Sequence, residues 1–180
     1  NLGHVERMLA SIDSRTERLA ELGINAQVTK AGILFSDLGK NGSNLAPLAQ
    51  ELFPAEFANE STRGLAFFKA FLLHEIPGRK LFREMAAERG LSESTIRAVE
   101  AANVGHNGPG AAGSWWQQNW DAQIKDYKGQ ANLKGAHGDL AAEYLGKAYP
   151  KVASLEGALH TGLDRRDQGT RDGSLKIMSE

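Results

Sequence analysis

The stretch Gly32-Ile33-Leu34-Phe35-Ser36-Asp37-Leu38-Gly39-Lys40-Asn41-Gly42 closes an apolar run with an aspartate, a glycine and a lysine. Its apolar residues predict a central helix over about 27–38, and its glycines predict a loop directly after that helix. Asp37 and Lys40 then place a carboxylate and an ammonium at the helix end, where such a pair can hold a metal ion and a phosphate. The plainer interpretation is an amphipathic helix ended by a glycine, with Lys40 complementing the helix dipole.

Helical periodicity extends over most of the chain. Apolar residues recur at helical spacing from Val5 to Leu22, and an apolar helix over Gly64–Leu73 leads to His74. Ser92 is a good cap for a further helix, and few stretches alternate with the period of two that strands need. We therefore expect an all-α fold, a helical bundle of about seven to nine helices.

The chain length and the positions of helix-breaking residues predict one domain with two loops. The 180 residues suffice for a single well-buried domain, so we expect residues 1–180 to form one. Residues 41–61 contain Asn, Gly, Ser and Pro around a short apolar element, and residues 105–113 are rich in glycine. Both segments are predicted to be loops near one end of the bundle.

Composition excludes several classes of function. A net charge of −1 gives no long-range attraction for nucleic acid or an anionic membrane, so neither is an expected partner. The absence of cysteine excludes disulfides and thiolate chemistry, and it suits a cytoplasmic protein. No apolar stretch approaches about 20 residues and no basic leader opens the chain, so we expect neither a membrane-spanning helix nor a signal peptide.

Further histidines and a late aspartate accompany the opening stretch. They lie in Gly3-His4-Val5-Glu6-Arg7-Met8, in His74-Glu75-Ile76-Pro77-Gly78-Arg79-Lys80-Leu81, in Gly105-His106-Asn107-Gly108-Pro109-Gly110, and at Asp164. Taken in order, these phrases resemble the HD-domain superfamily of metal-dependent phosphohydrolases, and most of all its HD-GYP cyclic-dinucleotide phosphodiesterases. The resemblance implies an HD-type helical domain over roughly residues 3–170, although each motif is short. The GYP phrase is missing after Gly110, which argues against a standard cyclic-di-GMP enzyme.

The resemblance implies a set of metal ligands. It assigns His4, Asp37 and Asp164 to one ion, and Asp37, as a bridge, with His74 and His106 to a second. It also makes Lys40 the lysine that orients the phosphate. Imidazole and carboxylate ligands suit a divalent transition metal, so one or two ions of Fe, Mn, Zn or Ni are expected.

Ser36 departs from the family pattern, which has its name-giving histidine at that position. A serine hydroxyl is a poor ligand for a transition metal, so the first ion would keep only three protein ligands. The site formed by Asp37, His74 and His106 is more intact.

Each of these side chains also has a structural interpretation. His4 can be a surface or capping residue, His74 a buried residue with a hydrogen-bonded partner, and His106 part of a turn. Asp164 competes with Asp167 and Asp172 for the last ligand position. His137 and His160 have no place in the pattern, although His160 lies four residues before Asp164 and can support it.

Three more residues are candidates for binding substrate. Arg165 and Arg166 can clamp a phosphate, or they can simply solubilise a surface loop. Trp115, with Trp116 and Trp120 on one predicted helix, can form a stacking wall for a planar ligand, or it can pack in the core.

The sequence leaves three functions open. The first is a metal-dependent phosphohydrolase or phosphodiesterase, in which metal-activated water attacks the phosphate ester of a small phosphorylated or nucleotide ligand. The second is a degenerate HD domain that acts as a sensor or interaction module with a protein partner and no turnover, and Ser36 supports it. The third is a diiron oxygenase, because some HD-fold relatives use the same ligands with dioxygen.

Overall fold

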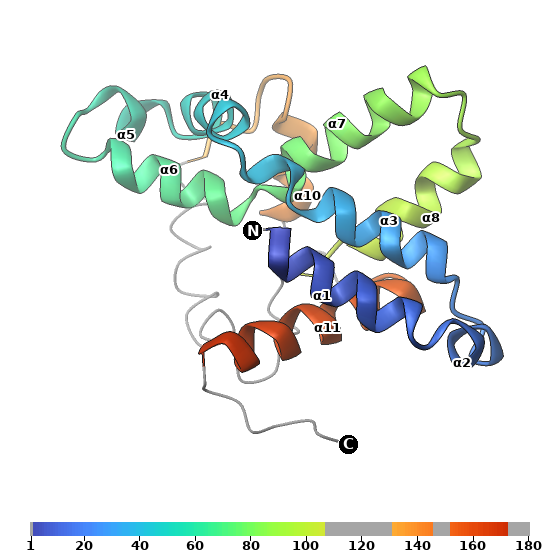
Figure 1. The fold of residues 1–180 in the computed structure, drawn as a ribbon. Coiled ribbons are helices and arrows are strands. Elements are labelled where there is room, and N and C mark those ends of the chain that lie inside the picture. Colours follow the sequence, from blue (N-terminus) through green and yellow to red (C-terminus); the bar gives the residue numbers. More distant parts are fainter. Residues whose placement is uncertain (1, 107–130, 146–151, 173–180) are drawn as a thin grey trace. The chain divides into compact units, whose positions relative to one another are not determined.

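A computed structural model describes residues 2–106, 131–145 and 152–172 (Figure 1). These residues contain α-helices and one 3-10 helix but no strand, so the predicted all-α fold is confirmed. The chain divides into two compact units. Unit 1 comprises Asn1–Phe35, Leu91–His106 and Val152–Glu180, and unit 2 comprises Ser36–Gly90 and Asn107–Lys151. A single domain over residues 1–180 therefore stays a prediction, and each unit is described by itself.

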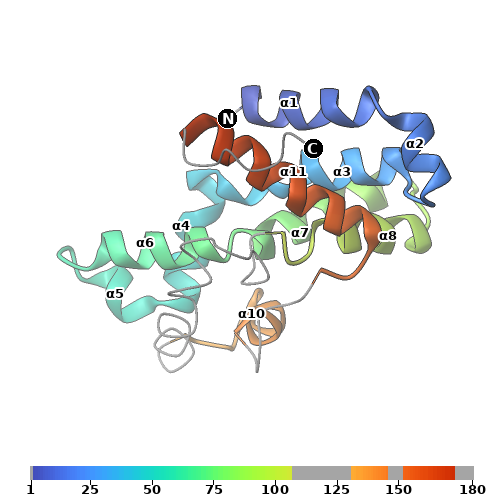
Figure 2. The same ribbon diagram turned by 90° about the horizontal axis from the view of Figure 1, so that it is seen from below.

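The described residues of unit 1 form five helices. They are α1 (Leu2–Asp13), α2 (Thr16–Glu21), α3 (Ala26–Ser36, which ends one residue past the unit boundary), α8 (Glu93–Asn103) and α11 (Leu155–Asp172). Helix α11 packs against both α1 and α8 (Figures 1 and 2). Gly157 permits the contact with α8, because a Cβ atom there would lie 2.7 Å from the Ala101 carbonyl oxygen.

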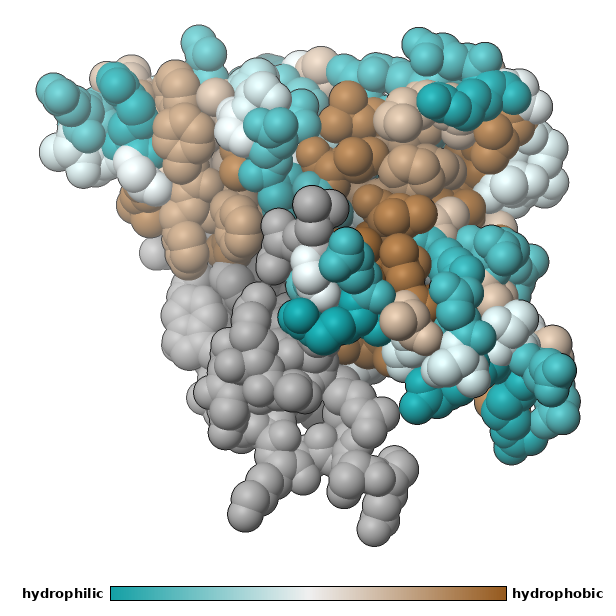
Figure 3. All heavy atoms as spheres, in the orientation of Figure 1, coloured by the Kyte–Doolittle hydropathy of each residue, from teal (hydrophilic) through white to brown (hydrophobic). Residues whose placement is uncertain are grey.

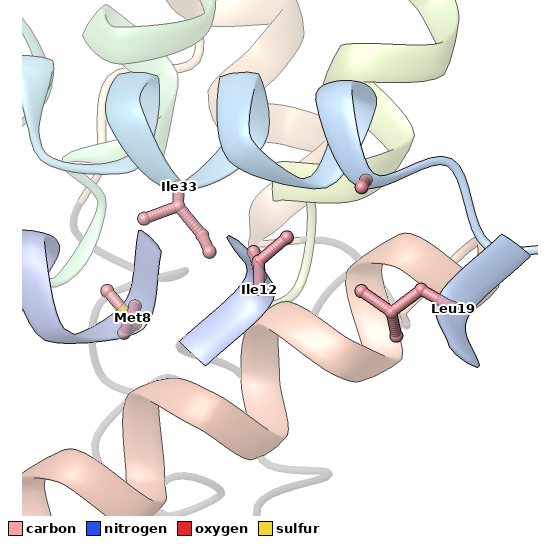
Figure 4. Close-up of a cluster of buried hydrophobic side chains, with 5 residues drawn as sticks. Met8, Ile12, Leu19 and Ile33 are labelled. Atoms are coloured by element: carbon pink, nitrogen blue, oxygen red, sulfur yellow. The ribbon is translucent and has the colours of Figure 1, made fainter. Parts of the chain in front are cut away.

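The core of unit 1 is apolar. Met8 and Ile12 from α1 lie beside Leu19 from α2 and Ile33 from α3 (Figure 4). All four are at most 6% exposed. Leu159 and Leu163 of α11 pack against these residues, so α11 lies beside α1.

Unit 2 is also helical. The elements in its described residues are η1 (Leu38–Lys40), α4 (Gly42–Leu52), α5 (Pro54–Ala58), α6 (Arg63–Leu72), α7 (Glu75–Glu88) and α10 (Gly138–Tyr144). Helices α4 and α5 pack on α6, and η1 packs on α7. Tyr144 of α10 is buried and hydrogen-bonds to the buried Glu75 of α7, and burial together with that carboxylate raises the pKa of the Tyr144 hydroxyl.

The prediction of a loop over residues 41–61 is wrong, because α4 and α5 occupy most of that segment. The Asn41 side chain caps α4 by accepting a hydrogen bond from the Ser43 N–H at 3.1 Å. The apolar residues of α4 recur at helical spacing and are buried, namely Leu45, Leu48, Ala49 and Leu52. Burial of this face outweighs the weak helix propensity of the Gly, Ser, Asn and Pro residues around it.

Other boundaries also differ from expectation. The helix predicted to run from Val5 to Leu22 is broken into α1 and α2, so the described residues hold ten α-helices rather than about seven to nine. Beyond Leu163, α11 continues to Asp172 instead of opening into a loop, because arginine and glutamine favour helices and no proline interrupts the run. Of the predicted loop over 105–113, only Gly105 and His106 lie among the described residues.

Local signals mark several helix ends, and the predicted cap at Ser92 is confirmed. Gly23 and Gly90 follow helices with φ of 73° and 66°, the left-handed conformation that glycine adopts without strain. The Ser92 hydroxyl accepts a hydrogen bond from the Thr95 N–H at 3.2 Å and so caps α8. Among residues 2–106, 131–145 and 152–172, no helix has both the length and the apolar character needed to cross a membrane.

Candidate functional site

Asp37 and Lys40 form an ion pair at the end of α3. Asp37 is the N-terminal cap of η1 and Lys40 is its last residue, so a single short turn joins them. The Lys40 Nζ atom lies 2.5 Å from Asp37 Oδ1, and both side chains remain partly exposed. The ammonium and carboxylate that the sequence places near each other are therefore in contact and open to solvent.

His74 lies beside this pair in unit 2. It is buried at the start of α7, and its Nδ1 lies 2.7 Å from the Phe71 carbonyl oxygen. A carbonyl only accepts, so Nδ1 donates and the neutral ring keeps its Nε2 lone pair. Ligand atoms of His74 and Asp37 lie within 4.8 Å of each other, so this His/Asp group could hold a metal ion.

Gly39 explains why the turn and His74 come together. A Cβ atom at Gly39 would lie 1.8 Å from the His74 carbonyl oxygen and 2.9 Å from the Gly78 nitrogen. No side chain fits there without moving backbone. Glycine between Asp37 and Lys40 thus permits η1 to pack directly on the first turn of α7.

Unit 1 holds a second group, centred on His4 and Asp164. His4 Nε2 lies 2.6 Å from Asp164 Oδ1, and the two residues are only 5% and 7% exposed. Burial by itself raises the pKa of Asp164, but the His4 hydrogen bond and the charges of His106, His4 and His160 outweigh it and hold that pKa at about 2. The carboxylate is therefore ionised at neutral pH, and His4 is a buried partner rather than a surface residue.

His106 and His160 complete the group in unit 1. Their rings stack with centroids 4.6 Å apart and planes 12° apart, and both residues are buried. His106 Nδ1 lies 2.8 Å from the Asn103 carbonyl oxygen, and His160 Nδ1 lies 2.9 Å from the Ala102 carbonyl oxygen. Both rings therefore donate through Nδ1, the arrangement that orients histidines which bind metals through Nε2.

His160 is the member of this group that the ligand pattern left out. The signal for it in the sequence was its position four residues before Asp164, which puts both side chains on one face of a helix. His137, also outside the pattern, has a structural role in unit 2. Its backbone N–H and its Nδ1 contact the two carboxylate oxygens of Glu51 at 2.7 and 2.8 Å.

The structure gives the position in a helix for Ser36 and for the arginines, and it does not describe the tryptophans. Ser36 is the buried last residue of α3. Arg165 and Arg166 lie within α11, as do Asp167 and Asp172, so these arginines do not belong to a surface loop. Trp115, Trp116 and Trp120 lie outside the described residues.

The donor set fits a divalent transition metal. Each unit offers imidazole nitrogens and a carboxylate, and three of the histidines have Nδ1 hydrogen-bonded to a backbone carbonyl. Such nitrogen and oxygen ligands suit Fe, Mn, Zn or Ni better than Mg or Ca. That the two groups bind one shared pair of ions stays a prediction.

No known protein-family model, curated protein or solved structure matches the chain. Membership of the HD-domain superfamily therefore also stays a prediction.

Proposed function

We propose that the protein is a metal-dependent phosphohydrolase or phosphodiesterase of the HD-domain type, acting on a small phosphorylated or nucleotide ligand. The observation that carries the proposal is the group of Asp37, Lys40 and His74 in unit 2. It combines metal-binding side chains with an ammonium that can neutralise a phosphate oxygen, and Asp37 and Lys40 are partly exposed beside the buried His74. A divalent ion bound there would supply activated water and charge neutralisation for the ester.

The chain's own residues have distinct tasks in this proposal. Asp37 and His74 bind the ion, and the hydrogen bond to the Phe71 carbonyl holds the His74 ring in the tautomer that can do so. Lys40 is paired with Asp37 in the metal-free protein. With the carboxylate turned to a metal ion, the Lys40 ammonium would pair with a non-bridging phosphate oxygen and stabilise the charge that accumulates there.

The resemblance supplies the other assignments. It assigns His106 as a further ligand of the ion that Asp37 and His74 bind. It assigns His4 and Asp164 as ligands of a second ion, with Asp37 as the bridge between the two. This ligand set draws on both units. Arg165, Arg166 and Trp115 are further substrate-binding candidates, and a cytoplasmic location agrees with the absence of cysteine.

Ser36 favours a second candidate, a degenerate domain that binds a ligand or a protein partner without turnover. The residue is 2% exposed, so its hydroxyl lies inside the protein where the family has an imidazole. A neutral hydroxyl does not replace that ligand. In this interpretation the remaining histidines and aspartates hold the helices together.

Metal analysis with a phosphodiesterase assay separates the two candidates. We expect protein purified without chelators to contain one or two transition-metal ions per chain and to hydrolyse bis-p-nitrophenyl phosphate. Asp37→Asn should remove most of the metal and the activity, whereas Asp139→Asn, at an exposed position of the same unit, should change neither. Ser36→His should raise the metal content toward two ions.

Circular dichroism of each variant shows whether the fold is retained. A folded wild-type protein that takes up no transition metal would refute the hydrolase and leave the degenerate domain. If Ser36→His folds but changes neither metal content nor hydrolysis, position 36 does not belong to a two-metal site.

A further inference from the structure

Helix α6 carries apolar side chains on its exposed face. Leu65, Phe68 and Phe71 recur every three residues and are 45%, 41% and 40% exposed, whereas Ala66 and Ala70 between them are fully buried. Figure 3 shows the resulting hydrophobic surface over α6. Aromatic side chains that are partly exposed in this way can contact a ligand.

Phe71 is the residue of this stripe that reaches the site of unit 2. Its ring centroid lies 5.7 Å from that of His74, and Lys40 Nζ lies 5.8 Å from the Phe71 centroid. Its backbone carbonyl also accepts the hydrogen bond from His74 Nδ1. One partly exposed aromatic ring therefore touches both the proposed metal ligand and the proposed phosphate lysine.

This juxtaposition selects for a particular substrate shape. A phosphate held at Lys40 and Asp37 leaves the rest of the ester beside Phe71. A saturated alcohol would leave the ring in water, whereas a planar base one sugar away from the phosphate would cover it. Stacking on an aromatic side chain tolerates any base, because every base has a π-face.

We propose that Phe71 is a specificity-determining binding residue, on which the planar base of a nucleotide stacks while its phosphate lies at Lys40. This inference rests on the proposed function and deepens it, since it names nucleotides as the substrate class. It also assigns the stacking role to a residue of α6, independently of Trp115.

Two phosphate esters that differ only in the base test this proposal. Adenosine 5′-monophosphate and ribose 5-phosphate should be compared with Mn²⁺-loaded wild-type protein by steady-state kinetics and by titration calorimetry. We expect the adenosine ester to have a KM and a Kd lower by roughly tenfold or more. Phe71→Leu should remove most of that preference, raising the KM and the Kd of the adenosine ester by roughly tenfold and those of ribose 5-phosphate by much less.

Matched variants separate stacking from a structural role. Phe71→Trp should restore the preference, because it restores an aromatic face, and the backbone carbonyl that holds His74 is the same in every variant. Leu65→Ala, on the same stripe two turns away, should change nothing. If Phe71→Leu weakens both esters equally, Phe71 only supports His74 and the proposal is wrong.

The outcomes also distinguish this proposal from the proposed function. Equal hydrolysis of both esters by the wild-type protein would refute stacking and leave the hydrolase intact. Preferential binding of the adenosine ester, lost in Phe71→Leu, would support stacking even if this monoester is not hydrolysed, and hydrolysis of bis-p-nitrophenyl phosphate then decides on the hydrolase. Absence of binding of the adenosine ester would refute stacking, and absence of bis-p-nitrophenyl phosphate hydrolysis as well would also refute the hydrolase.

Discussion

Asp164→Asn should destabilise metal-free protein in a way that depends on pH. The carboxylate is 7% exposed and lies 2.6 Å from His4 Nε2. Its pKa is held at about 2, against the usual 3.8, so proton affinity is lower in the folded state. Because each tenfold change in proton affinity is worth about 1.4 kcal/mol, the ionised carboxylate stabilises the folded protein by about 2 kcal/mol at neutral pH.

The direction of the pH dependence follows from the lowered pKa. A group whose folded-state pKa is depressed contributes its full stabilisation above its unfolded pKa, here above about pH 4. The contribution is lost as the pH falls from there toward 2. The free energy of unfolding of the Asp164→Asn variant should therefore lie about 2 kcal/mol below that of wild type at pH 7 and approach it near pH 2.

Urea unfolding followed by circular dichroism measures this difference after metal is removed with a chelator. Asp139→Asn, at an exposed position on α10, controls for the loss of one negative charge. If the free energy of unfolding of Asp164→Asn lies below that of wild type by the same amount at pH 7 and pH 2.5, the lowered pKa does not stabilise the fold. A difference below about 0.5 kcal/mol at pH 7, the range typical of surface substitutions, would show that the His4 pair is not formed without metal.

Two further predictions concern unit 2. Gly39→Ala should lower the free energy of unfolding by at least about 2 kcal/mol and weaken metal binding, because its Cβ would lie 1.8 Å from the His74 carbonyl oxygen. As a control, Gly42→Ala should change the free energy of unfolding by less than about 1 kcal/mol, because no atom lies within 4 Å of its Cβ. If urea unfolding shows the same loss for both variants, the close contact of Gly39 with the His74 carbonyl is not the cause. Lys69→Met should cost about 1–3 kcal/mol, because Lys69 is 2% exposed and its Nζ lies 2.6 Å from Glu56 Oε1. Adding Glu56→Gln should recover part of that loss, and no recovery would mean that the ion pair is not the cause.

Local sequence was sufficient for the helical class and for one part of the site. Apolar residues at helical spacing predict α3 and α6, and Ser92 and Gly90 mark boundaries through contacts within a few residues. Asp37 and Lys40 are only three residues apart, so a single turn is enough to bring their charges into contact. These features depend on backbone geometry that neighbouring residues set.

Segment 41–61 shows where local propensity fails. Its Gly, Asn, Ser and Pro residues favour a loop, yet α4 forms because Leu45, Leu48 and Leu52 become buried against other parts of unit 2. The free energy of that burial belongs to the packed unit and cannot be read from the segment alone.

The sequence by itself therefore determined the helical class, the Asp37–Lys40 pair and a list of candidate ligands. Tertiary structure decided which candidates meet within each unit. His4 and Asp164 are 160 residues apart and touch because α1 packs on α11. His160 stacks on His106, and Gly39 lets η1 approach His74. Such contacts depend on how closely whole helices pack, and the spacing of residues along the chain does not encode that distance.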